Sequence, residues 1–202
     1  LDGRRADELR RTELARLLAV VPQEPSTPPW MTVGEYVLMG RTPHLGPLAK
    51  EGRGDREAAA RAISRLDLDG YEERRLETLS GGEKQRAVVA RALAQEARIV
   101  LLDEPTAALD IGHQQQALEL LDSLRAESGL TLVAAMHDLT LAAQYADRMV
   151  LLDAGRVVAD GAPGEVLTEA RVGAHYGAEV DVVPAGGRVA VIPRRSSHTS
   201  TV

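Results

Sequence analysis

Two carboxylates follow a short apolar run near the middle of the chain. Asp103 and Glu104 end the stretch IVLLDE, residues 99–104. Such a run is typical of a buried parallel strand, and open α/β sheets bind ligands beyond the carboxyl ends of their strands. Asp103 could hold Mg²⁺ through water, and Glu104 could polarise an attacking water as a general base. A charged strand end without a catalytic task is the alternative.

A second pattern, LSGGE at residues 79–83, could bind an anion. Ser80 and Glu83 have the S-x-x-E spacing of a capping box, which predicts a helix with Ser80 as its N-cap. A helix N-terminus presents free N–H groups and the positive end of the helix dipole, and Gly81 and Gly82 would let a phosphate approach the backbone closely. An ordinary capped helix is the alternative interpretation.

Two further polar residues follow apolar runs. Gln23 comes after LLAVVP, and its neutral amide could join the coordination of Mg²⁺ or water without adding charge. His137 comes after TLVAAM, where an imidazole could contact a phosphoryl oxygen and the attacking water. Neither residue is decisive alone, since His137 could be a structural residue at a strand–helix junction with Asp138 as the N-cap of the next helix.

The elements that must position these residues alternate between strands and helices. We predict a buried strand over 17–23, and a helix that begins with a T-x-x-E capping box at Thr32 and continues through YVLMGR, residues 36–41. A glycine-rich connection over 46–56 leads to a further helix. That helix has one apolar face, made by Ala59, Ala62, Ile63 and Leu66.

The alternation of apolar runs and helical segments in the second half of the chain predicts an α/β sheet. After the strand at 98–105 comes a helix that ends at Gly129, and then a second buried strand over 131–138. Two strands around a turn follow over 148–161, and Gly186-Gly187 mark the turn of a final hairpin. The polar tail RRSSHTSTV is predicted to be disordered. The apolar face of the helix before Gly129 is predicted to consist of Ala117, Leu120, Leu121 and Leu124.

Composition excludes several classes of protein. The 202 residues contain no cysteine, so disulfides and thiolate metal sites are excluded. A net charge of −6 and an aromatic content of 2% disfavour nucleic acid as a partner. No secretory signal and no membrane-spanning run is recognisable in the sequence. Any link to a membrane is therefore expected to pass through a partner.

Taken in order, these motifs resemble the nucleotide-binding subunit of ABC transporters. The resemblance rests on Gln23, LSGGE, IVLLDE, AALD at 107–110 and His137, and covers nearly the whole chain. It implies a P-loop NTPase fold, α/β with a parallel sheet and an inserted helical subdomain. It also implies ATP and Mg²⁺ as cofactors, and hydrolysis of ATP by the complete protein.

The resemblance assigns a role to each matching residue. Gln23 would be the Q-loop glutamine, and Asp103 the Walker B aspartate that holds Mg²⁺ with it. Glu104 would be the catalytic glutamate and His137 the switch histidine. Asp110 would be the D-loop aspartate. The signature motif would bind nucleotide through Ser80, Gly81, Gly82 and Glu83.

GRTPHLG at 40–46 and ALDIGHQ at 108–114 are similar to the ATPases of importers for ferric siderophores, haem and cobalamin. The implied partners are transmembrane permease subunits, a second ATPase subunit and, indirectly, a substrate-binding protein. The implied location is the cytoplasmic face of the membrane. His44 and His113 are expected to serve in surface or interface packing, and neither is assigned to a ligand.

The 202 residues contain no G-x-x-x-x-G-K-[ST], the family's phosphate-binding loop. We therefore expect an N-terminally truncated version of the fold, which binds ATP weakly or not at all by itself. In the family the signature motif acts in trans, capping a phosphate held by the second subunit. The alternative function is accordingly a non-hydrolysing partner that completes the site of an intact subunit. A soluble ABC-type ATPase of DNA repair or translation is a third, less favoured reading.

We expect four segments. Residues 1–23 would be the remnant of the α/β core up to the Q-loop, and 24–95 the helical subdomain with the signature motif. Residues 96–170 would be the α/β core with Walker B, D-loop and switch histidine. Residues 171–202 would be the terminal hairpin and tail.

Overall fold

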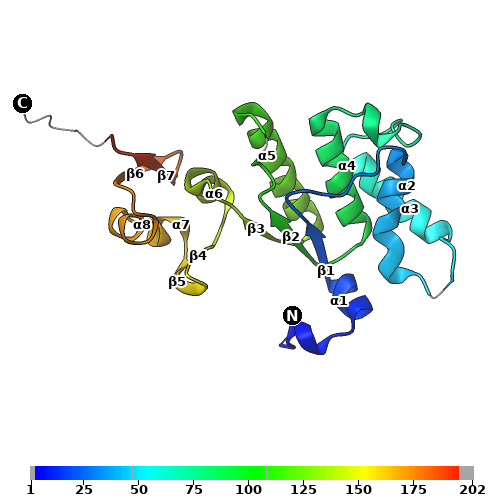
Figure 1. Ribbon diagram of the computed structural model, residues 1–202, viewed down its shortest axis with the longest axis horizontal. Helices are drawn as coiled ribbons and strands as arrows, with labels where there is room; N and C mark the ends of the chain where they lie inside the picture. The colour runs from blue at the N-terminus through cyan, green and yellow to red at the C-terminus, as the bar shows by residue number, and fades with distance from the viewer. Residues whose placement is uncertain (1–2, 47, 108, 196–202) are drawn as a thin grey trace, which may run out of the picture. The chain divides into compact units, whose positions relative to one another are not determined.

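A computed structural model describes residues 3–46, 48–107 and 109–195 of the chain. The chain forms two compact units, Leu1–Ala135 and Met136–Val202, whose elements are labelled in Figure 1. The boundary between the units falls inside the segment predicted to run from 96 to 170. The four-segment division itself therefore stays a prediction.

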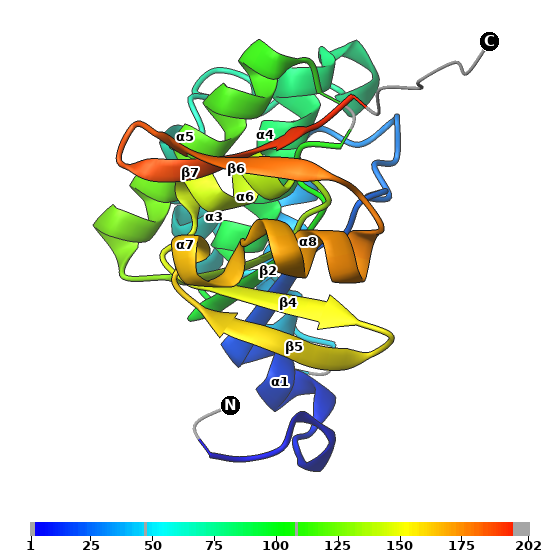
Figure 2. The ribbon, with the colours of Figure 1, turned by 90° about the vertical axis from the view of Figure 1, so that its left-hand side faces the viewer.

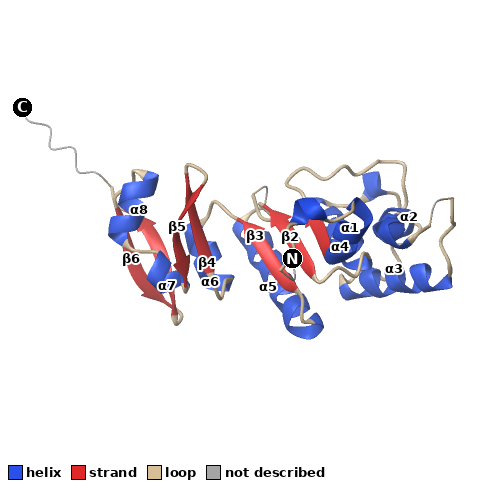
Figure 3. Ribbon diagram, turned by 90° about the horizontal axis from the view of Figure 1, so that it is seen from below, coloured by secondary structure: helices blue, strands red, loops and turns tan. Residues whose placement is uncertain are grey.

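The first unit is built on a parallel sheet of three strands. β1 (Leu18–Val21), β2 (Ile99–Asp103) and β3 (Thr131–Ala135) lie side by side in that order (Figure 3). Asp103 is paired with Ala135, and Val21 with Leu102, so the three strands end at the same edge of the sheet. The parallel α/β fold predicted from the apolar runs is confirmed.

The burial predicted for β3 is wrong. Its sequence TLVAA is as apolar as that of β2, yet half of the surface of Val133 is exposed and Ala134 and Ala135 are exposed as well. The physical reason is packing: both β1 and β3 are outer strands of this sheet, but α1 (Arg11–Leu17) and α4 (Gly81–Ala94) pack on β1, whereas the main packing neighbour of β3 among the described elements is β2.

Three helices pack on one another beside the sheet. α2 (Val33–Leu38), α3 (Arg53–Arg65) and α4 (Gly81–Ala94) bury a face made of alanine and valine with Tyr36 and Ile63. The predicted capping box at α2 is confirmed, because Glu35 N donates to Thr32 Oγ1 at 3.2 Å and Thr32 N donates to Glu35 Oε2 at 2.9 Å. The unit also contains η1 (Ala6–Glu8), α1 (Arg11–Leu17) and η3 (Leu76–Thr78).

The α-helix after Thr32 is shorter than predicted. It ends at Leu38 and tightens into the 3₁₀-helix η2 (Met39–His44). Pro43 explains the change, because it has no N–H to donate to the Met39 carbonyl and its ring would clash there. The hydroxyl of Thr42 donates to the Met39 carbonyl instead, at 2.6 Å.

α5 (Ile111–Ser128) ends, as predicted, at Gly129, which has a positive φ of 64°. Its buried residues are Leu118, Leu121 and Leu124. Ala117 and Leu120, predicted to lie on the apolar face, are half-buried and line a groove beside α4. The prediction is confirmed as buried for Leu121 and Leu124, and it left out Leu118.

The second unit contains two antiparallel hairpins. β4 (Met149–Asp153) pairs with β5 (Arg156–Gly161), and β6 (Val180–Ala185) pairs with β7 (Arg188–Pro193), as Figure 2 shows. Gly186 and Gly187, at the second turn, have φ values of 58° and 82°. Both predicted hairpins are confirmed.

Short helices cover the second of these hairpins. α6 (Leu139–Tyr145) packs on β7, where Thr140 Oγ1 accepts from Val191 N at 2.9 Å and Gln144 Nε2 donates to Val189 O at 3.0 Å. α7 (Pro163–Val166) and α8 (Glu169–Tyr176) complete the unit. Its small core contains Ala143, Leu167, Val172 and Val180.

The predicted disordered tail includes residues 196–202, which lie outside the described residues. Among the helices of the described ranges, none combines the length and the apolar character needed to cross a lipid bilayer.

Candidate functional site

The N-terminus of α4 has the geometry predicted from LSGGE. Ser80 Oγ accepts from Glu83 N at 3.3 Å, and Glu83 Oε2 accepts from Ser80 N at 2.7 Å. The N–H of Ser80, reinforced by its hydroxyl and by Tyr71 and Arg74, holds the pKa of Glu83 below its ordinary value. Glu83 is therefore a charged part of the cap at neutral pH, and its carboxylate completes the first turn of the helix.

The two glycines after Ser80 leave the mouth of the helix open. A Cβ at Gly81 or Gly82 would meet no atom of the described chain within 4 Å. Ser80 and Gly81 are exposed and Gly82 is half-buried. A phosphate oxygen could therefore approach the free N–H groups of this turn without displacing a side chain.

Gln23 and Glu104 are brought together by the parallel pairing of β1 and β2. Gln23 follows β1, Glu104 follows β2, and Gln23 Nε2 donates to Glu104 Oε2 at 3.1 Å. Glu104 has a positive φ of 46°, which is uncommon for a residue with a side chain. Its N–H donates to the carbonyl of Ala135 at 3.0 Å, so the end of β3 helps to fix this turn.

The side chains near the carboxyl ends of β1 and β2 offer too few oxygens to complete the coordination of Mg²⁺ by themselves. Asp103 is exposed at the last position of β2. The side-chain amide of Gln23 donates through Nε2 to Glu104, and its oxygen is still able to bind a metal ion. No group of three or more His, Cys, Asp or Glu gathers among the described residues. Magnesium bound by one or two protein oxygens takes its remaining ligands from water and substrate phosphates, and this pair fits that pattern.

Asp110 caps α5 and orients a histidine. Its Oδ1 accepts from His113 N at 3.0 Å, and its Oδ2 lies 2.8 Å from His113 Nδ1. These contacts, with the backbone N–H of His113 as the largest cause, lower the pKa of Asp110. His113 is exposed, in agreement with a surface residue, and its predicted alternative role in interface packing stays a prediction.

His137 lies two residues beyond β3, at the start of the second unit, and is exposed. Asp138 caps α6 through its Oδ1, which accepts from Leu141 N at 2.9 Å, as anticipated for a strand–helix junction. Gln23, Asp103 and Glu104 gather at the edge of the parallel sheet, and Ser80 to Glu83 and Asp110 begin two helices of the same unit.

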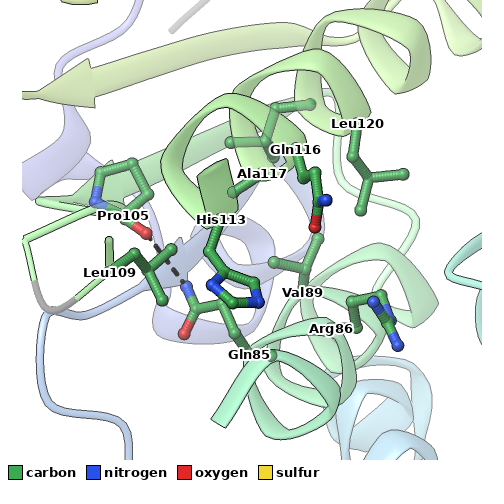
Figure 4. Close-up of a pocket in the computed structure, with 11 residues that line it drawn as sticks. Gln85, Arg86, Val89, Pro105, Leu109, His113, Gln116, Ala117 and Leu120 are labelled. Atoms are coloured by element: carbon green, nitrogen blue, oxygen red, sulfur yellow. Dashed lines mark hydrogen bonds between the residues drawn. The ribbon is translucent and has the colours of Figure 1, made fainter. Parts of the chain in front are cut away.

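One contact beside the candidate site is not visible in the sequence. Gln85, in the second turn of α4, donates through Nε2 to the carbonyl of Pro105 at 3.5 Å (Figure 4). This long hydrogen bond links the helix of the serine–glycine turn to the loop that follows Glu104. Gln85 belongs to no motif that the sequence analysis recognised, so no signal in the sequence pointed to this contact.

Figure 4 also shows the groove beside this contact. α4 contributes Gln85, Arg86 and Val89 to its walls, and α5 contributes His113, Gln116, Ala117 and Leu120.

Comparison with known proteins gives consistent matches. The family model described as ABC transporter matches residues 1–107. The petrobactin import ATP-binding protein FpuC of Bacillus anthracis is 39% identical over 98% of this chain and 72% of its own length. The ferric enterobactin transport ATP-binding protein FepC of Escherichia coli (strain K12) is 39% identical over 100% of this chain and 75% of its own length. The hemin import ATP-binding protein HmuV of Rhodococcus jostii is 43% identical over 98% and 68%.

Solved structures agree with these relatives. An inward-facing metal-chelate type ABC transporter superposes with a TM-score of 0.81 and 30% identity, over 89% of this chain and 73% of that one. The dimeric structure of a bacterial ABC transporter cassette gives a TM-score of 0.65 and 29% identity, over 81% and 72%. A post-hydrolysis state of that cassette contains ADP and Pi.

Proposed function

The chain belongs to the ABC transporter family, and on that premise we propose that it is the ATP-binding subunit of an importer for a ferric siderophore, haem or cobalamin. The substrate class is supported by the names of relatives that act on petrobactin, ferric enterobactin and hemin. In this proposal the chain works at the cytoplasmic face of the membrane with permease subunits and a second ATPase subunit, and a substrate-binding protein delivers the cargo.

The observation that carries the proposal is the 3.1 Å hydrogen bond between Gln23 and Glu104. These residues are 81 positions apart and come from two separate motifs, so their contact is a product of the fold. A glutamate held by an amide at the end of a parallel strand is placed to orient an attacking water and to accept its proton.

The remaining site residues have matching roles in the proposal. Asp103 and Gln23 hold Mg²⁺ together with the phosphates of ATP, and the ion when bound neutralises charge on those phosphates. The N–H groups at Gly81 and Gly82, with the hydroxyl of Ser80, receive phosphate oxygens. His137 keeps in the proposal the role of switch histidine that the sequence resemblance implies.

Asp110 and Glu83 keep the turns of this site ordered, as their lowered pKa values and N-cap contacts support. The division into segments 1–23, 24–95, 96–170 and 171–202 is part of the same proposal, with the membrane partner meeting the helical segment. Trp30 and Met39, which are 70% and 46% exposed, are apolar side chains available for such a contact.

The experiment is a mixing assay with a complete relative. A full-length import ATPase whose own signature serine is replaced by arginine is titrated with this chain, and release of inorganic phosphate is measured. We expect the chain to restore hydrolysis and Ser80→Arg to abolish the restoration, because arginine would fill the open turn. Ser123→Arg, on the exposed side of α5, is the matched control and is expected to behave like the unmodified chain.

A second variant separates the two candidate roles. In a second mixture the relative keeps its signature serine but has its phosphate-loop lysine replaced by alanine, so that any hydrolysis uses this chain's own carboxylates; if this chain takes part in hydrolysis, its Glu104→Gln variant lowers that rate by at least about tenfold, a typical loss for a general base. If Glu104→Gln has no effect while Ser80→Arg abolishes restoration, the chain acts only as the trans-acting partner. No restoration by the unmodified chain would refute both roles.

A further inference from the structure

Arg41 is a buried charge that the proposed function does not use. It is 7% exposed and lies in η2, within the GRTPHLG motif. Its Nε donates to Asp55 Oδ1 at 3.1 Å, and its Nη1 donates to Glu96 Oε2 and to the carbonyl of Ala94, both at 2.8 Å. A buried guanidinium is tolerated only with such partners, so η2, α3 and the end of α4 are fixed together here.

Two neighbours of Arg41 hold the same end of α4. A Cβ at Gly40 would lie 2.2 Å from the carbonyl oxygen of Arg91, so the two backbones are in close contact at this point. His44 Nε2 lies 2.8 Å from the carbonyl oxygen of Gln95. The last carbonyls of a helix have no partners inside it, and here η2 supplies them. We call Gly40, Arg41 and His44 the clasp.

The clasped end of α4 is also tied to the sheet. The side chain of Gln95, the C-cap of α4, donates to the carbonyl of Leu18 at 2.8 Å and to the carbonyl of Ala15. Leu18 is the first residue of β1, the strand that leads to Gln23. The C-terminal end of α4 is therefore joined to η2, α3 and β1 by several short hydrogen bonds.

The opposite end of α4 has weaker polar ties. Gln85 reaches the Pro105 carbonyl at 3.5 Å, and Glu83 lies 3.8 Å from Arg74. The capping box at Ser80 binds only within the first turn, and beyond it the side chain of Tyr71 adds one hydrogen bond to Glu83 from the segment before the helix. The buried face of the helix consists of alanine and valine side chains, which make no polar contacts. The polar contacts that define the position of α4 are concentrated at its C-terminal end.

We propose that Arg41 is a positioning residue, which sets where Ser80, Gly81 and Gly82 lie by fixing the far end of α4. The inference rests on the proposed function, because it concerns the phosphate site of that proposal. The 14 residues of α4 span about 21 Å. A tilt of about 5° about the clasp moves the serine–glycine turn by about 1.8 Å, and a displacement of about 1 Å can cost about 100-fold in rate.

Distance measurement tests the geometry without nucleotide. The chain has no cysteine, so spin labels can be placed at Lys84→Cys in α4 and Ser123→Cys in α5 alone. We expect Arg41→Gln to shift the mean distance between the labels by about 1 to 2 Å, or to broaden the distribution of distances by that amount, because a tilt of α4 by about 5° displaces its first turn this far. Arg53→Gln, which breaks an exposed pair with Glu57 on α3, is the matched control and is expected to leave it unchanged.

Conservative variants separate positioning from loss of fold. Arg41→Lys keeps the positive charge but replaces the planar guanidinium, which donates in several directions, by a single ammonium group. We therefore expect this variant to shift the label distance as well. Asp55→Asn leaves the contacts of Arg41 to Ala94 and Glu96 in place, and should produce a smaller shift. Far-UV circular dichroism of each variant reports whether the helices persist, and Asp55→Asn keeps the test decisive if Arg41→Gln unfolds.

The mixing assay supplies the functional readout. With Arg41→Gln we expect at least a tenfold lower maximal rate, while the ATP concentration for half-maximal rate, set by the partner's own loop, stays the same. Unchanged label distances in all folded clasp variants would overturn the inference. A shift of the labels together with no restoration by the unmodified chain would support the positioning role and refute the proposed function.

Discussion

Replacement of Gly40 by alanine is the sharpest test of how η2 meets α4. The added Cβ would lie 2.2 Å from the carbonyl oxygen of Arg91 and 3.2 Å from the Cβ of Ala94. Real Cβ contacts essentially never fall below 3.0 Å, so the two backbones must separate by at least about 0.8 Å. Because the neighbour is backbone in the last turns of a helix, no side-chain rotation can relieve the clash.

The cost follows from the usual penalty for overpacking. Forcing an extra carbon into a packed contact costs about 1 to 3 kcal/mol. For a chain of this length, each kcal/mol lowers the melting temperature by about 2 to 4 °C, so we expect Gly40→Ala to lower it by roughly 2 to 12 °C. Separation of the backbones would also lengthen the contacts of Arg41 and His44 with α4.

The assay is urea unfolding followed by far-UV circular dichroism, with Gly54→Ala as the matched control. Gly54 lies in the first turn of α3, and a Cβ there would meet no atom of the described residues within 4 Å. Alanine favours a helix by about 0.5 to 1 kcal/mol over glycine, so the control should leave the midpoint unchanged or raise it. A Gly40→Ala midpoint equal to that of the unmodified chain would refute the close contact between η2 and α4.

Three further outcomes follow from other contacts. Ser80→Ala should cost about 1 kcal/mol in urea unfolding, since Glu83 N loses its acceptor, whereas Ser80→Gly should cost less. Asp55, Glu83 and Asp110 have pKa values lowered chiefly by backbone N–H donors, so their contribution to stability is present above pH ~4 and lost as pH falls through the folded values. The urea midpoint should therefore be nearly level from about pH 7 to 5 and fall below about pH 4; a midpoint that rises on acidification would contradict this. Val133→Lys on β3 should reduce light scattering from self-association, because charge on an exposed apolar edge strand blocks pairing with another chain; unchanged scattering would contradict it.

Local elements were predictable wherever a short-range rule decides them. The capping boxes at Thr32 and Ser80 each need only four consecutive residues, and both formed as predicted. The hairpin turn at Gly186-Gly187 needs positive φ, which glycine adopts without strain. One failure was also local, because Pro43 limits the helix by a rule that spans four residues. The exposure of β3, apolar by sequence, depended instead on which elements pack against it.

The candidate site divides in the same way. Residue types and their order were sufficient to indicate Ser80, Asp103 and Glu104 as phosphate and magnesium groups, because that chemistry depends on short motifs at strand and helix ends. The sequence could not place Gln23 against Glu104, since 81 residues separate them and only the pairing of β1 with β2 joins them. Nor could it indicate that Glu104 would occupy a positive-φ turn fixed by the Ala135 carbonyl.

By itself, the sequence determined the class of fold, the family and the identity of the chemical groups, because hydrophobic period, caps and short motifs are local properties of a chain. Tertiary structure decided which of those groups meet and what holds them in place. Arg41 illustrates the difference: its burial and its three acceptors come from η2, α3 and the end of α4, segments up to 55 positions apart. Contacts at that separation depend on how helices pack and strands register, and no local pattern encodes them.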